Sequence, residues 1–483
     1  MVLSFPYDIQ VAVTCFLSVR DILNLQTTCK QLRKTCESRY VWLYILQDIL
    51  SAIPLPNLRH SLTQLSADEL KKKAIIATRL AHLWSQETVI PQKAYKFECD
   101  SGVVSLHLLP GGKWMVIVHF DGTLVLHDLR SEVPEVRIVD RTLCDVDLRM
   151  DVDLRLWVCQ SGEILVILKT FSGEYYNGLA QIAVFRVDID PEPSMRLITK
   201  VKKDIDIRAY SAEGDLLSFA WSNYDVSKQY VAIRKMASTP DKVEQEITIE
   251  ISEQNLILGT AIIPSGKLLV STGSRLLVYD LPSFESLGSA TLQMPIPVWE
   301  SELEDTISFL PWCQAIHPTP DERPEGHVIF WTGDWFMAMT PGQGCLLDDH
   351  LLRFRIDSPK NPNPLRSISP SRLFWLSGAR SKRTVMTCTL SLGETRFSRM
   401  RLDQAPLGPG PDSGHQLAVR FKRGMRYTQP QSDEMPAIDI YKASVEGMAW
   451  DEESGRLCLL LDSEARRTAD EECPKEIVFI DFV

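Results

Sequence analysis

Apolar residues in the first part of the chain recur with the spacing of helices. One stretch has apolar side chains at positions 9, 13, 16 and 17, which fall on one side of a helix with about 3.6 residues per turn. Pro6 precedes this stretch, where its missing N–H costs a helix little. Asp21 is the expected N-cap of a second helix that contains Ile22. Two further helices are expected before residue 53, the last of them over 41–50.

The helical part of the sequence ends in two steps. Ile53-Pro54-Leu55-Pro56 breaks the pattern, because a residue that precedes proline avoids helical backbone angles. Ser66-Ala67-Asp68-Glu69 then has the form of a capping box and opens one more helix, which extends to about Trp84. We therefore expect a helical domain over 1–50 and a linker with a connector helix over 51–94.

From about residue 95 the pattern changes to the period-two alternation of strands. Three strands are expected over 101–106, 113–118 and 123–129, with the turn Asp121-Gly122 between the last two. A similar pair is expected over 267–272 and 275–281. Roughly seven such units fill residues 95–483, at a spacing near the ~40–60 residues of propeller blades.

These units predict a mainly β fold in which the N-terminal helices precede a closed, seven-bladed β-propeller over 95–483. A single four-stranded blade cannot bury both of its faces, and closing a ring of blades protects the sheet edges. We expect the strand at 95–99 to pair with the strand at 477–482 and so to lock the ring. Six or eight blades remain open as alternatives.

Composition narrows the classes of function. A net charge of −11 and a pI near 5.4 argue against general nucleic-acid binding, which needs a basic surface. No apolar run is long enough for a membrane helix, so no membrane partner is expected. Eleven scattered cysteines without a C-x-x-C pair are typical of reduced thiols in a cytoplasmic or nuclear protein. Nucleophile, phosphate-loop and metal motifs are missing, so we expect no cofactor, no metal and no enzymatic activity.

Residues 3–45 resemble the F-box family. The family begins with Leu-Pro, has an isoleucine three positions later, and continues through a leucine, an Asp-Leu step, a Val-Cys segment and a distal tryptophan. The counterparts here are Phe5-Pro6, Ile9, Leu17, Asp21-Ile22, Leu25, Thr28-Cys29 and Trp42. Phe5, Thr28 and Leu32 depart from the family pattern.

The resemblance implies a partner. F-boxes bind the small adaptor subunit of SCF-type cullin–RING ubiquitin ligases and, through it, a cullin. A helical unit of about 45 residues is also too small to bury its apolar residues alone, so an exposed stripe needs a partner. By resemblance, the residues that form or support the adaptor-binding surface are Pro6, Ile9, Val13, Leu17, Leu25 and Trp42. Packing of these residues against the connector helix or the propeller is the alternative.

The expected blades resemble degenerate WD repeats. His127-Asp128 and Tyr279-Asp280 stand where that family has Trp-Asp. An F-box joined to a propeller resembles a substrate receptor, whose propeller binds the protein that is ubiquitinated. The alternative is a non-catalytic propeller scaffold in another assembly, without ubiquitination.

One segment has an unusual charge. Between Arg366 and Arg426 there are twelve basic and three acidic residues, a formal charge of +9. Arginine binds phosphate and carboxylate groups with two parallel hydrogen bonds. We therefore consider this segment as the contact for an acidic or phosphorylated part of a protein substrate, with solvated surface charge as the alternative. The candidate substrate-binding residues are Arg372, Arg380, Lys382 and Arg383.

Overall fold

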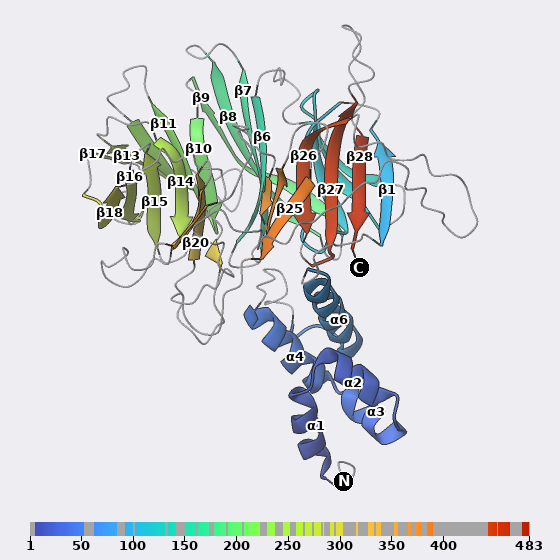
Figure 1. The fold of residues 1–483 in the computed structure, drawn as a ribbon. Coiled ribbons are helices and arrows are strands. Elements are labelled where there is room, and N and C mark those ends of the chain that lie inside the picture. The colour runs from blue at the N-terminus through green and yellow to red at the C-terminus, as the bar shows by residue number, and fades with distance from the viewer. Residues whose placement is uncertain are drawn as a thin grey trace.

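The structure is a computed structural model in which a helical domain precedes a set of β-sheets (Figure 1). It describes residues 5–52, 62–84, 92–99, 102–130, 134–141, 151–159, 163–172, 178–189, 192–204, 207–222, 229–236, 245–251, 257–263, 266–272, 275–281, 284, 290–293, 296–302, 315–316, 327–332, 335–339, 352–355, 366–368, 372–377, 384–389, 443–451, 453–463 and 476–482.

Five described helices form the N-terminal part. Their bounds are α1 (Tyr7–Cys15), α2 (Val19–Gln26), α3 (Lys30–Cys36), α4 (Arg39–Ala52) and α6 (Ala67–Trp84). The helices expected from the spacing of apolar residues are thus present, and each is close to its expected place. In Figure 1 they lie below the sheets, and α6 extends toward the lower ends of the last strands.

The expected start of the second helix is wrong. Ser18, not Asp21, is the N-cap of α2, because the backbone N–H of Asp21 donates to Ser18 Oγ over 3.2 Å. The Ser18 hydroxyl in turn donates to Asp21 Oδ2 over 2.6 Å. Asp21 therefore lies inside the first turn, where a carboxylate also favours the positive end of the helix dipole.

The capping box of the connector helix is confirmed. The backbone N–H of Glu69 donates to Ser66 Oγ over 3.3 Å, and the N–H of Ser66 donates to Glu69 Oε2 over 2.8 Å. The two side chains therefore satisfy each other's backbone donors at the start of α6.

The helical domain has its own apolar core. Trp42 and Ile22 are completely buried at its centre, and α6 contributes Leu70 and Ala74 to the same cluster. Arg39 holds the segment before α6, because its guanidinium donates to the carbonyl oxygens of residues 62, 63 and 65. The connector helix is therefore packed into the helical domain.

The β part is built from sheets of mostly antiparallel strands. Within the described residues, the strands belong to seven sheets. One sheet contains β1 (Lys93–Glu98), β28 (Glu476–Asp481), β27 (Arg456–Ser463) and β26 (Ala443–Asp451). The second contains β2 (Val103–Leu108), β3 (Trp114–His119), β4 (Leu124–Asp128) and β5 (Glu135–Asp140). The third contains β6 (Asp151–Val158), β7 (Ile164–Ser172), β8 (Leu179–Asp188) and β9 (Ser194–Lys203).

The other four sheets follow in chain order. They are β10 (Ile207–Glu213), β11 (Leu216–Ser222), β12 (Gln229–Lys235), β13 (Gln245–Ile251) and β17 (Ala290–Gln293); β14 (Ile257–Ile263), β15 (Lys267–Thr272), β16 (Arg275–Asp280) and β18 (Trp299–Glu302); β19 (Ala315–Ile316), β20 (His327–Thr332), β21 (Trp335–Met339) and β22 (Leu352–Arg355); and β23 (Arg366–Ile368), β24 (Arg372–Ser377) and β25 (Thr384–Thr389). Strand β17 departs from the chain order, because it follows β16 along the chain but pairs in parallel with β13.

The expected pairing of the first and last strands is confirmed. β1 pairs antiparallel with β28, and Tyr95 lies opposite Phe479 with their rings stacked at 4.9 Å between centroids. The first strand of the β part therefore completes the sheet whose other strands come from the end of the chain.

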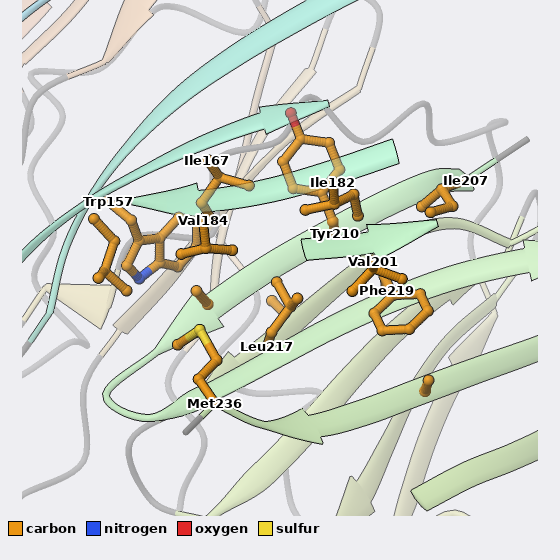
Figure 2. Packing of buried hydrophobic residues seen from close by; sticks show 14 of the residues in the cluster. Trp157, Ile167, Ile182, Val184, Val201, Ile207, Tyr210, Leu217, Phe219 and Met236 are labelled. Carbon is orange, nitrogen blue, oxygen red and sulfur yellow. The ribbon is translucent and has the colours of Figure 1, made fainter. Parts of the chain in front are cut away.

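Neighbouring sheets pack face to face. In Figure 2, Trp157 and Val184 from β6 and β8 lie near Leu217 of β11 and Met236, which directly follows β12 in the next sheet. The same kind of cluster joins the sheets of β2 and β26, of β2 and β6, and of β10 and β14. Both faces of the sheets of β2, β6 and β10 are thereby covered by apolar neighbours, as in propeller blades.

Candidate functional site

The exposed apolar residues of the described chain concentrate in the first 44 residues. Seven of the twelve large apolar side chains that are exposed among the described residues lie there. We call this set the α1 patch: Phe5, Tyr7, Ile9, Val13, Phe16, Tyr40 and Tyr44. Exposed apolar groups in such a concentration are typical of protein interaction sites.

Two helices form the α1 patch. Ile9, Val13 and Phe16 follow one another at intervals of four and three residues, so they share one side of α1 and its C-terminal end. Phe16 is 82% exposed, and its ring lies edge-on to Tyr44 of α4 at 6.5 Å between centroids. The patch is therefore continuous from α1 to α4.

The opposite side of α1 is buried and carries two polar residues beside the apolar Val11. Gln10 and Thr14 are each only 2% exposed. The amide of Gln10 donates to the carbonyl oxygen of Phe5 over 2.8 Å and accepts from the hydroxyl of Thr35 over 3.2 Å. Thr14 donates to the Gln10 carbonyl oxygen over 2.7 Å. α1 thus buries two satisfied polar side chains beside Val11 and turns most of its large apolar side chains to solvent. An ordinary surface helix does the opposite, and we call this arrangement the reversed polarity of α1.

The six residues predicted for adaptor binding divide into three groups. Pro6, Ile9 and Val13 are exposed on or beside the α1 patch. Leu17 and Leu25 are half-buried and pack against the helical core. Sequence reasoning placed Phe16 on the same side of the helix as Ile9 and Val13 but did not propose Phe16, Tyr40 or Tyr44 as adaptor-binding residues.

Trp42 lies in the interior. It is completely buried, and the ammonium of Lys71 on α6 lies 5.8 Å from the centroid of its ring. Its indole Nε1 has no hydrogen-bond partner within the part of the chain that the structure describes. Trp42 therefore supports the α1 patch through the core on which α1 and α4 rest.

The described groups give no sign of a catalytic centre. Burial raises the pKa of the Cys15 thiol, and it raises that of Cys159 to about 12. These thiols therefore stay protonated and poorly nucleophilic. In the described ranges, no three or more His, Cys, Asp or Glu side chains are placed to hold a metal ion. No described helix has the length and apolar character needed to cross a membrane.

The two dipeptides that resemble Trp-Asp have structural roles. Asp128 accepts from the backbone N–H of Arg130 over 3.0 Å and from its Nε over 2.9 Å. The Arg130 side chain holds the pKa of Asp128 at about 2, with a smaller effect of Arg137. Tyr279 is buried, whereas the Asp280 carboxylate accepts from Lys267 over 2.7 Å at the surface.

The basic segment is only partly described. Arg372 is the first residue of β24, which ends at Ser377. Arg380, Lys382 and Arg383 lie outside the described residues. Their predicted contact with a substrate therefore stays a prediction.

The comparisons with known proteins identify a domain at the start of the chain. The model of the F-box domain family matches residues 2–44. A comparison with curated proteins gave no match. Residues 2–44 are thus an F-box domain, and the region contains the whole α1 patch.

Two solved structures are similar to the chain over most of its length. The β-propeller domain of Cps50 (Swd1) from Myceliophteria thermophila is 10% identical, with a TM-score of 0.46, over 81% of this chain and 99% of that one. Raptor from Chaetomium thermophilum is 8% identical, with a TM-score of 0.42, over 98% of this chain and 41% of that one. An F-box domain joined to blade-like sheets points to an interaction adaptor.

Proposed function

We propose that this protein is a substrate receptor of an SCF-type ubiquitin ligase. In this proposal the α1 patch binds the small adaptor subunit, which connects the chain to a cullin, and the β part binds the protein that is ubiquitinated. The protein itself then contributes binding and not catalysis, without a cofactor. The function places it in the cytoplasm or the nucleus.

The observation that carries the proposal is the reversed polarity of α1. A free surface helix ordinarily faces the core with its apolar side, because burial stabilises by roughly 25 cal/mol per Å² of apolar surface. Here the buried side is held by hydrogen bonds of Gln10 and Thr14 and by the packing of Val11, and the side with Ile9, Val13 and Phe16 is left to solvent. Such a side gains its burial from a partner, and the F-box match indicates which partner.

For the β part we propose a closed ring of seven blades. The pairing of β1 with β28 supports closure, because it joins the two ends of the β part in one sheet. The first strands of neighbouring sheets also lie beside each other, as β2 does with β6 and β26, and β23 with β26. The boundaries 1–50, 51–94 and 95–483 remain our proposed domain division.

The experiment measures the affinity of the purified full chain for the purified adaptor subunit. Truncation of an aromatic side chain at the centre of an interface costs about 2 kcal/mol or more, so Phe16→Ala should raise Kd about 30-fold. Val13→Asp should prevent measurable binding, because it brings a charge into an apolar contact. Val136→Asp is the matched control, since Val136 is an exposed valine on β5, at 56% exposure, far from the patch in sequence.

Two outcomes would contradict the proposal in different ways. If the unmodified chain forms no complex with the adaptor, the proposed receptor function is wrong. The alternative, a propeller scaffold in another assembly without ubiquitination, is then favoured. If the complex forms but Phe16→Ala and Val13→Asp bind as tightly as Val136→Asp, the adaptor uses another surface.

A further inference from the structure

The connector helix meets the β part at the turns of two sheets. Lys73, in the second turn of α6, forms an ion pair with Glu453, which lies in the turn between β26 and β27. The two side chains are 26% and 17% exposed, so the pair is largely shielded from water. Hydrogen bonds from Ser66 lower the pKa of Glu69 on α6, and Lys113, at the end of the turn between β2 and β3, adds a smaller effect in the same direction.

These two turns are fixed to each other beneath the helix. The Asp451 carboxylate accepts from the backbone N–H of Gly111 over 3.1 Å and from that of Ser454 over 2.8 Å. Arg456 donates to the carbonyl oxygen of Gly112 over 2.9 Å, and its guanidinium also pairs with Asp481 of β28. Glu453 is therefore mounted on a rigid support that joins the first and last sheets.

Lys73 is mounted just as firmly on the helical domain. Leu70 and Ala74, on either side of it in α6, are completely buried in the helical core. Lys71 in the same turn donates to Gln26 Oε1 of α2 over 2.9 Å. The ion pair therefore connects two bodies that are each held by their own cores.

The ion pair lies at a distance from the point where the chain itself connects α6 to the β part. The chain leaves α6 at Trp84 and enters β1 at Lys93, which is one attachment between the two bodies. Lys73 lies eleven residues before Trp84, about 16 Å along the helix at about 1.5 Å per residue. A helix attached to the β part at one end only can change its orientation, whereas a second attachment at this distance fixes the orientation of the helix relative to the sheets.

We propose that Lys73 and Glu453 form a latch that fixes the direction in which the F-box domain projects from the sheets. If the proposed function holds, this direction sets where a bound substrate lies relative to the rest of the ligase. The latch itself concerns only this chain, so its test does not depend on adaptor binding.

The test measures the distribution of distances between two spin labels in the full chain by pulsed electron paramagnetic resonance. The labels replace Glu37 and Lys202, which are exposed residues of the F-box domain and of β9, through noncanonical amino acids that spare the native cysteines. Variants are Lys73→Gln, Lys73→Glu and the charge swap Lys73→Glu with Glu453→Lys. Lys267→Glu is the matched control, because it breaks the Lys267–Asp280 pair within another sheet.

We expect a narrow distribution for the unmodified chain and for Lys267→Glu. Lys73→Gln and Lys73→Glu should broaden it, and the charge swap should make it narrow again. A melting temperature close to that of the unmodified chain shows that broadening does not come from unfolding. A distribution as narrow in Lys73→Gln as in the unmodified chain would overturn the latch, as would one that stays broad in the charge swap. Failure of the unmodified chain to bind the adaptor would refute the proposed function alone.

Discussion

Trp42 offers a direct test of the division between core and surface in the F-box domain. Its side chain is completely buried in the helical core, whereas Phe16 of the α1 patch is 82% exposed. The perturbations are Trp42→Ala, Trp42→Phe and Phe16→Ala. Only changes at Trp42 should reduce the stability of the helical domain, because Phe16 leaves water only when a partner binds.

The expected magnitudes follow from the environment of the indole. Truncating a buried tryptophan to alanine costs about 3–5 kcal/mol, through lost burial and the cavity that remains. Trp42→Phe keeps most of the ring contacts and removes the Nε1–H group, which has no partner among the described residues. A buried donor without a partner costs about 1–3 kcal/mol, so its removal offsets the smaller ring. We therefore expect Trp42→Phe to change stability by less than about 1 kcal/mol.

Hydrogen exchange of the full chain, followed by mass spectrometry, isolates this domain from the sheets. The slowest amides of α4 report its opening free energy. A loss of about 4 kcal/mol in Trp42→Ala corresponds to about a thousandfold faster exchange. Phe16→Ala should leave these amides as protected as in the unmodified chain. The reasoning is refuted if Trp42→Ala exchanges at the unmodified rate, or if Trp42→Phe costs as much as Trp42→Ala.

Three further predictions concern the β part. Gly112→Ala should lower the melting temperature more than Gly214→Ala does: both glycines have positive φ, at 61° and 58°, but a Cβ at Gly112 meets Ser454, whereas Gly214 has open space. Burial, aided by Glu453, raises the pKa of Asp451 to about 7, so the folded chain holds this proton more tightly and loses stability as pH rises from about 4 to about 7. Urea unfolding at about pH 5 and about pH 8 should show a smaller loss of stability in Asp451→Asn than in the unmodified chain. An equal loss of stability in the two chains would contradict this reasoning. Charge reversal of Arg380, Lys382 and Arg383 should weaken the binding of a phosphorylated, glutamate-rich peptide in a fluorescence titration. An unchanged affinity would show that the peptide does not contact these three residues.

The pH prediction compares the unmodified chain with Asp451→Asn because another group, His127, changes stability with pH in the opposite direction to Asp451. Burial lowers the pKa of His127 to about 4, so the folded chain gains stability as pH rises from about 4 to about 6.5. His127 titrates equally in the unmodified chain and in Asp451→Asn. The difference between the two chains therefore isolates the effect of Asp451.

Local pattern was sufficient for much of the fold. The strand expected over 267–272 is β15 with those bounds, because a short apolar run there is flanked on both sides by Gly and Ser, which favour turns. The pairing of β1 with β28 was also predictable, since closing a ring of blades brings the first and last strands together. The cap of α2 was not, because Ser18 and Asp21 are both good N-caps, and the choice depends on Val19 packing into the core.

The candidate site was harder to predict than the fold. Spacing placed Ile9 and Val13 on one side of a helix, but spacing alone does not say whether that side faces the core or a partner. The answer depends on Gln10 and Thr14, whose buried hydrogen bonds are tertiary contacts. The position of Trp42 was hidden for the same reason, since α6 covers it from more than twenty residues further along the chain.

The reversed polarity of α1 links binding to stability. A small helical domain that leaves Ile9, Val13 and Phe16 in water lacks part of the burial that stabilises larger domains. A partner that binds only the folded domain supplies it, and stabilises that domain by about 2.7 kcal/mol at a concentration about 100 times its Kd. The α4 amides should therefore exchange about a hundredfold more slowly when the adaptor is present at that excess. At the same adaptor concentration, Phe16→Ala should lose most of this protection, although without adaptor it exchanges like the unmodified chain. Equal protection of both chains by the adaptor would mean that the α1 patch is not where the partner binds.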